Sequence, residues 1–121
     1  MRNHHNLRAF QLADELAVAV YRHTANFPRE EQFGLTSQVR GAAVSVPSNI
    51  VEGCAKASEA DYVRFLDIAY GSACETQYQL SLAHRLGFLS DEGFAAVDTI
   101  AVETAKVING LIRAIRKRSE V

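Results

Sequence analysis

The chain has 121 residues, of which 48% are hydrophobic and 22% charged, and its formal net charge is −1. This length and composition are typical of a globular protein with one buried core, so we expect a single domain over residues 1–121. The nearly balanced charge excludes a strong overall attraction to nucleic acid or acidic membranes, so such binding would need a local patch. The sequence contains neither an apolar run of about 20 residues nor an apolar leader, which predicts a cytoplasmic protein with no membrane role.

Apolar residues recur with the 3.6-residue period of a helix in four segments, and none of the segments alternates as a strand does. The first predicted helix spans residues 7–25. The link that follows contains Pro28 and Gly34, both of which interrupt helices. Two aromatic residues in this link, Phe27 and Phe33, are expected to pack under the end of the helices.

The other three predicted helices have recognisable ends. The second starts with Thr36 as its N-cap and ends near residue 55, and Pro47 inside it is expected to bend the backbone just before it. The third starts with Ser58 as N-cap and ends at about residue 86, because Gly87 favours a helix stop. The fourth starts with Ser90 as N-cap and runs into the basic C-terminal segment.

Because the connections are short, consecutive helices should run antiparallel, which predicts an all-α, up-down-up-down four-helix bundle. If Cys54 and Cys74 lie on neighbouring antiparallel helices, their heights along the bundle differ by about twelve residues, or roughly 18 Å. A disulfide cannot span that distance, so both thiols are predicted to be reduced and half-buried.

One flank of the second predicted helix is polar. Its residues are spaced by three, four or seven positions and therefore share one side of the helix beside the apolar stripe. They are Gln38, Ser45, Asn49, Glu52 and Lys56. Such a flank is either simply solvated or part of a packed polar surface.

The third predicted helix is apolar or small on most sides. A surface helix of a monomer usually has a charged outer face. We therefore expect a partner subunit to cover the flank of this helix that lies outside its core stripe. The flank consists of Arg64, Ile68, Gly71, Glu75, Tyr78 and Leu82. Glycine weakens a helix, which predicts close backbone packing at Gly71.

If the chain folds back on itself near residue 57, charged residues of the second and third predicted helices fall at matching heights along the bundle. This places Arg40 level with Glu75, and Glu52 level with Arg64 or Val63. We expect two charge pairs, either between the helices of one chain or between subunits, which would fix the packing register.

No set of residues indicates catalysis or a cofactor. A di-iron bundle needs Glu-x-x-His on two helices, and here no Glu is followed by His three residues later. The serines and cysteines lack a neighbouring base, and there is no glycine-rich phosphate loop. We therefore predict a protein that is not an enzyme and that binds no metal or cofactor.

Basic residues form two candidate contacts for RNA. The C-terminal group has a second explanation, since positive charge is favourable at the C-terminal end of a helix. In an oligomer, repeated weak phosphate contacts would add up. The two groups consist of Arg40, Lys56 and Arg64, and of Arg113, Arg116, Lys117 and Arg118.

Two segments, "FGLTSQVRGAAVSVPSNIVEG" and "ASEADYVRFLDIAYGSACETQ", resemble the four-helix bundle proteins encoded in intervening sequences of bacterial 23S ribosomal RNA genes. The resemblance rests on Phe33-Gly34-Leu35, on the Arg40 segment, on the pattern of residues 43–53 and on residues 64–75. It implies a homopentameric ring assembled through the face that carries these motifs. Gly41 and Lys56 stand where the family often has arginine.

The resemblance also guides the expected function, which is a homo-oligomeric binding module that associates with ribosomal RNA or a ribonucleoprotein. The alternative is a pentameric scaffold for other proteins with no nucleic-acid role. Both assign the same residues to the oligomer interface or to an internal polar network. These residues are Gln38, Arg40, Ser45, Asn49, Glu52, Ile68, Gly71, Ser72, Glu75, Tyr78 and Leu82.

Overall fold

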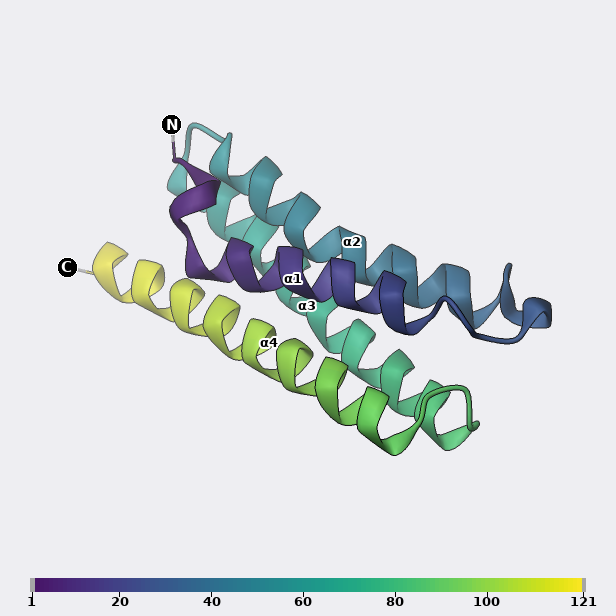
Figure 1. Ribbon diagram of the computed structural model, residues 1–121. Coiled ribbons are helices and arrows are strands. Elements are labelled where there is room, and N and C mark those ends of the chain that lie inside the picture. Colours follow the sequence, from purple (N-terminus) through teal and green to yellow (C-terminus); the bar gives the residue numbers. More distant parts are fainter. Residues whose placement is uncertain (1, 121) are drawn as a thin grey trace.

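The computed structural model describes residues 2–120, and within them the chain forms four long helices, two short 3-10 turns and no strand (Figure 1). The elements are η1 (His4–Asn6), α1 (Arg8–His23), η2 (Arg29–Glu31), α2 (Leu35–Cys54), α3 (Glu59–Arg85) and α4 (Asp91–Ser119). The predicted all-α fold is confirmed. None of these helices is both long enough and apolar enough to cross a membrane.

Helices that follow one another in the chain pack side by side and run in opposite directions. Side chains pair in reverse order along α2 and α3, where Ser45 meets Ser72 and Gln38 meets Gln79. Helix α1 packs on α2 and α4, which closes the bundle (Figure 1). The result is the up-down-up-down arrangement, in which α1 begins and α4 ends at the same end of the molecule.

The core is built from the apolar stripe of each helix. Small residues such as Ala13, Ala69 and Ala73 are completely buried in one cluster with larger ones such as Leu66 and Ile108. Removing such apolar surface from water is the main force that holds the helices together, and full burial of one leucine or isoleucine is worth about 1.5–3 kcal/mol.

Local signals define most helix ends as predicted. Ser58 Oγ accepts a hydrogen bond from the backbone N–H of Asp61 (3.1 Å), and Ser90 Oγ accepts one from Gly93 (3.0 Å). Gly87 ends α3 with a φ of 81°, a left-handed conformation that suits glycine. Its N–H donates to the carbonyl of His84, as in a Schellman cap.

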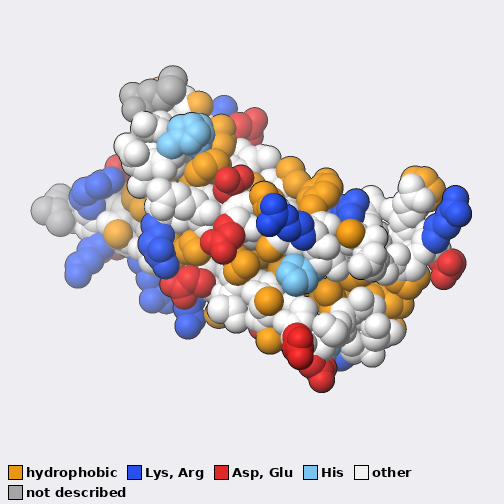
Figure 2. Space-filling view, in the orientation of Figure 1, with side chains coloured by type: hydrophobic (Ala, Val, Ile, Leu, Met, Phe, Trp, Pro, Cys, Tyr) orange, Lys and Arg blue, Asp and Glu red, His pale blue; other side chains and the backbone are white. Residues whose placement is uncertain are grey.

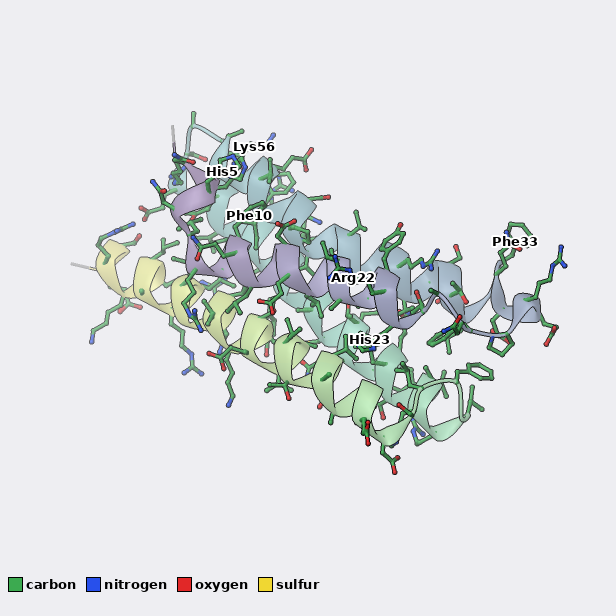
Figure 3. The ribbon with its side chains drawn as sticks, in the orientation of Figure 1. His5, Phe10, Arg22, His23, Phe33 and Lys56 are labelled. Carbon is green, nitrogen blue, oxygen red and sulfur yellow. The ribbon has the colours of Figure 1, made fainter. Side chains whose placement is uncertain are left out.

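The link between α1 and α2 differs from the prediction in two ways. Helix α2 begins at Leu35, so Thr36 is not its N-cap. The N-cap position is instead Gly34, and the acceptor for the first helical N–H comes from Glu31, whose Oε1 accepts a hydrogen bond from Leu35 (3.0 Å). Phe27 is buried as predicted, but Phe33 is 90% exposed, so its predicted packing is wrong. The turn η2 and the Glu31 cap direct the chain so that Phe33 projects from the tip of the link (Figure 3).

Both cysteines are free, as predicted. They are not alike, however, because Cys54 is buried and Cys74 is exposed. Burial raises the pKa of the Cys54 thiol above its ordinary value of 9.0. Cys54 lies at the end of α2 against the core, whereas Cys74 lies on the outer side of α3.

Candidate interaction surface on helices α2 and α3

Helices α2 and α3 approach each other closely where Gly53 meets the start of α3. A Cβ atom at Gly53 would lie 3.0 Å from Phe65 Cβ and 3.3 Å from the carbonyl oxygen of Tyr62. A larger residue at this position would force the neighbouring atoms of Phe65 and Tyr62 to shift by a few tenths of an ångström. Gly53 is thus explained by close packing inside the chain.

A hydrogen-bonded network links the same two helices near their middle. The hydroxyls of Ser45 and Ser72 are 2.9 Å apart. Asn49 Nδ2 donates to the hydroxyl and to the carbonyl oxygen of Ser45, at 2.9 and 2.8 Å. All three side chains are half-buried. This part of the predicted polar flank is therefore an internal network between helices.

Gln38 extends the network toward the far end of α2. Gln79 Nε2 donates to Gln38 Oε1 at 3.4 Å. Gln79 is buried, and its Oε1 has no hydrogen-bond partner among the described residues. An unsatisfied buried oxygen is unfavourable, so a hydrogen-bond donor supplied by whatever packs over Gln79 would be stabilising. Gln79 was not identified from the sequence, because it lies next to the core stripe of α3.

The outer side of α2 is an uncharged stripe that the sequence analysis missed. Its members recur every three or four residues and therefore share one face, which is the signal that could have found them. We call it the α2 outer stripe, and it consists of Ser37, Gly41, Val44, Ser48, Val51 and Ala55, all exposed. Most surface helices carry charged residues on their outer face, so an uncharged stripe of this length is unusual.

The neighbouring flank of α3 continues this surface, and Glu75 is the one charged residue between Ile68 and Leu82. Ile68 and Tyr78 are 43% and 60% exposed, and Leu82 is half-buried. Gly71 lies between them, and a Cβ atom there would meet no atom within 4 Å. The close packing predicted at Gly71 therefore has no counterpart among the described residues of the same chain.

The predicted charge pairs do not form within the chain. The pairs Ser45–Ser72 and Gln38–Gln79 set a register in which Arg40 lies level with Gln77 and Glu52 with Phe65. The height opposite Arg40 is shifted by two residues from the prediction, and the height opposite Glu52 by one or two. Among residues 2–120, neither Glu52 nor Glu75 makes an ion pair. The register is set by side-chain packing between the helices, which the length of the turn does not determine.

Arg40 contacts α1 instead. Its Nε donates to Thr24 Oγ1 at 2.9 Å, and its guanidinium lies over the ring of Tyr21, 4.5 Å from the ring centre. Lys56 is sixteen residues further along the chain, or about 24 Å in a helix. The predicted basic group of Arg40, Lys56 and Arg64 is therefore divided, with Arg40 near the opposite end.

Lys56 and Arg64 do come together, and they are joined by Arg2, which the sequence analysis did not identify. Lys56 and Arg64 both lie over the ring of Phe65, at 5.0 and 4.6 Å from its centre. Arg2 lies over the ring of Tyr62 at 4.1 Å and donates through Nη1 to the carbonyl oxygen of Lys56 (2.9 Å). Arg64 also pairs with Asp61 at 3.7 Å.

The C-terminal basic residues reach the same end of the bundle, where two of them are paired with acids. Arg116 contacts Asp67 at 2.8 Å, and Arg118 contacts Glu59 at 3.1 Å. Hydrogen bonds from Ser119 and Arg118 lower the pKa of Glu59 below its ordinary value. Exposed ion pairs of this kind contribute little to stability, but they reduce the net positive charge of the surface.

Lys and Arg side chains thus gather where the chain enters α1 and leaves α4 (Figure 2). Arg64 and Arg116 line one hollow of about 580 Å³ together with Glu59 and Asp67. Arg113 lies about one turn before Arg116 on the exposed side of α4. We call the following residues the basic end: Arg2, Lys56, Arg64, Arg113, Arg116, Lys117 and Arg118.

Residues 2–120 contain no group of three or more His, Cys, Asp or Glu side chains that could hold a metal ion. Fold and surface together define a small four-helix bundle protein whose α2 and α3 share an outer face with little charge, with a basic end beside it.

Comparison with known proteins names the family. The profile of the 23S rRNA-intervening sequence protein family matches residues 5–110, so the chain belongs to this family, as the resemblance predicted. A crystal structure of a protein of unknown function from the S23 ribosomal protein family of Bacteroides thetaiotaomicron has the same fold. Its TM-score is 0.80 at 24% identity, and the match covers 87% of this chain and 95% of that chain. No curated protein matches the chain.

Proposed function

We propose that the protein is a non-enzymatic homo-oligomer that binds RNA or a ribonucleoprotein. Copies join through the α2 outer stripe and the exposed flank of α3, and the basic end contacts the RNA. The observation that carries the proposal is the uncharged α2 outer stripe beside exposed Ile68 and Tyr78. Exposed apolar surface of this kind marks interaction sites in soluble proteins.

The arrangement of this surface favours a ring. The faces of α2 and α3 differ in sequence and shape, so a contact of α2 on one copy with α3 on the next is head-to-tail. Head-to-tail contacts close into rings when the rotation per copy divides a full turn. The homopentamer implied by the family resemblance is such a ring.

RNA binding is supported by the location of the basic end. In a head-to-tail ring every copy has the same orientation, so all copies of the basic end lie on one rim. Weak phosphate contacts from several copies then act together. The description of the family, which refers to 23S rRNA, agrees with an RNA partner.

A protein scaffold is the second candidate. Its support is the pairing of Arg116 with Asp67 and of Arg118 with Glu59, which neutralises part of the basic end. The salt dependence of binding separates the two functions, because phosphate contacts weaken steeply as salt increases.

The deciding experiment is a fluorescence anisotropy titration with a labelled, structured fragment of 23S ribosomal RNA at about 50 and 200 mM salt. We expect micromolar or tighter binding that weakens at the higher salt and is lost in the double variant Lys56→Glu, Arg64→Glu. The matched control is Arg22→Glu, which reverses an exposed charge in the last turn of α1, away from the basic end, and should leave binding unchanged. No binding at the lower salt would contradict the RNA function and direct the search to protein partners.

A further inference from the structure

We infer that Tyr78 of one copy inserts into a hollow beside Phe33 of the next copy, and that Phe33 in turn covers α3 of that first copy near Leu82 and Leu86. This inference rests on the proposed self-assembly and specifies its contact. Neither aromatic side chain is buried in the core of its own chain, so the fold of a single chain does not explain its position.

Phe33 is exposed but firmly placed. It is the most exposed large apolar side chain of the described residues, at 90%. The backbone on both sides of it is fixed, since Gly34 N–H donates to the carbonyl oxygen of Glu31 (3.0 Å) and the Glu31 carboxylate caps α2. Figure 3 shows the ring at the tip of the link, directed away from the bundle. An exposed aromatic ring on a hydrogen-bonded stretch of backbone is well suited to serve as an anchor for a partner.

A hollow of about 410 Å³ lies next to Phe33, and Tyr21, Ser37, Arg40 and Gly41 are among the residues that line it. The absence of a side chain at Gly41 keeps its floor open, since a Cβ atom there would meet nothing within 4 Å. The walls are two aromatic rings and a guanidinium. This combination favours an aromatic side chain with a polar tip, such as tyrosine.

Tyr78 is at the correct height to fill this hollow on a neighbouring copy. The Gln38–Gln79 and Ser45–Ser72 pairs place Tyr78 level with Val39, between Ser37 and Gly41. In a head-to-tail ring whose helices run side by side, a residue meets the neighbour at about its own height. Tyr78 is 60% exposed and therefore available.

The same register brings Phe33 to the apolar end of α3. The first residue of α2, Leu35, is level with Leu82 in this register, and Phe33 precedes it, which places Phe33 beyond that height, toward Leu86. Leu86 is 54% exposed. One contact thus covers three of the exposed apolar side chains of the chain, namely Phe33, Tyr78 and Leu86.

Charge complementarity supports the same pairing of faces. Arg40 lines the hollow and makes no ion pair with a carboxylate among the described residues. Glu75 lies one turn before Tyr78 on the exposed flank of α3, and it has no ion-pair partner there either. Insertion of Tyr78 would bring Glu75 toward Arg40 of the neighbour, so the pair predicted from the sequence would form between copies.

The test is native mass spectrometry over a dilution series of the wild type and of the variants Phe33→Ala and Tyr78→Ala. We expect each variant to dissociate at a protein concentration at least tenfold higher than the wild type does. The control is Val18→Ala, which removes an apolar side chain of α1 that is 45% exposed and should not change assembly. Circular dichroism verifies that every variant keeps its helices. Arg40→Glu and Glu75→Arg should each weaken assembly, and together they should restore it.

A covalent test locates the contact directly. In a Cys74→Ser background, Gly41→Cys and Tyr78→Cys are made in separate chains, which are then mixed, refolded and oxidised. A disulfide-linked species in the mixture, absent from either chain alone, supports the inference. If the wild type is monomeric at every concentration, self-assembly itself is overturned. If it is oligomeric while Phe33→Ala and Tyr78→Ala assemble like the wild type and no disulfide forms, only the Tyr78 contact is overturned.

Discussion

The hydroxyls of Ser45 and Ser72 meet at 2.9 Å between α2 and α3, and Asn49 donates to Ser45 from the same side. This contact fixes the height of one helix against the other. It therefore determines which residues of the outer face lie side by side, and through them the geometry of any contact with a second copy.

Removing the Ser45 hydroxyl should reduce stability. Ser45→Ala leaves the half-buried Ser72 hydroxyl without its side-chain partner and removes one of the two hydrogen bonds of Asn49 Nδ2, at a cost of about 1 kcal/mol. The free energy of unfolding is measured by urea denaturation. The matched control is Ser48→Ala on the exposed side of the same helix, which has the same gain in helix propensity but breaks no side-chain hydrogen bond. Equal stability changes in the two variants would contradict a stabilising role of the network.

Gly53→Ala should destabilise the protein although alanine is the better helix former. The added Cβ would lie 3.0 Å from Phe65 Cβ, and such overpacking costs about 1–3 kcal/mol. Gly110→Ala is the control, because a Cβ atom there meets nothing within 4 Å and the change should stabilise α4 by up to about 1 kcal/mol. Thermal unfolding of both variants tests the contrast. A rise in the melting temperature for Gly53→Ala would show that the helices separate easily.

Stability should fall in alkaline solution. Burial raises the pKa of Tyr62 from 10.0 to about 12, and it also raises the pKa of Cys54 above 9.0. The folded state therefore holds these protons more tightly than the unfolded state. The resulting stabilisation is complete below pH 9.0 and is lost as pH rises toward about 12.

The melting temperature measured across that pH range tests this expectation. Tyr62→Phe removes the ionisable group while keeping the ring, so its melting temperature should fall less steeply than that of the wild type. Parallel curves for the two proteins would rule out Tyr62 as the source of the alkaline loss.

The two thiols should react at different rates. Cys74 is exposed and Cys54 is buried, so a thiol reagent should modify one group rapidly in the folded protein and the second only on unfolding. The absorbance change after addition of an aromatic disulfide reagent gives the number of thiols that react per chain in each phase. Cys74→Ser should abolish the rapid phase, and two rapid equivalents in the wild type would indicate that the end of α2 opens readily.

The helices and most of their ends could be predicted because the signals are local. Ser58, Ser90 and Gly87 act on backbone groups within a few residues, and the 3.6-residue period of each apolar stripe identifies the buried face. These features do not depend on how the helices are packed. The family could be identified for a related reason, since its motifs lie within two continuous segments.

Most of the failures concern relations between segments. The height of α2 against α3 is set by interlocking side chains at Gly53 and along the serine network, and it shifts Arg40 away from Glu75 by about two residues. The Glu31 cap moves the start of α2 and leaves Phe33 exposed. The sequence by itself therefore determined four amphipathic helices and their order in a bundle. Only the tertiary structure decided which outer residues lie side by side, because packing at the helix contacts, rather than spacing along the chain, sets the register.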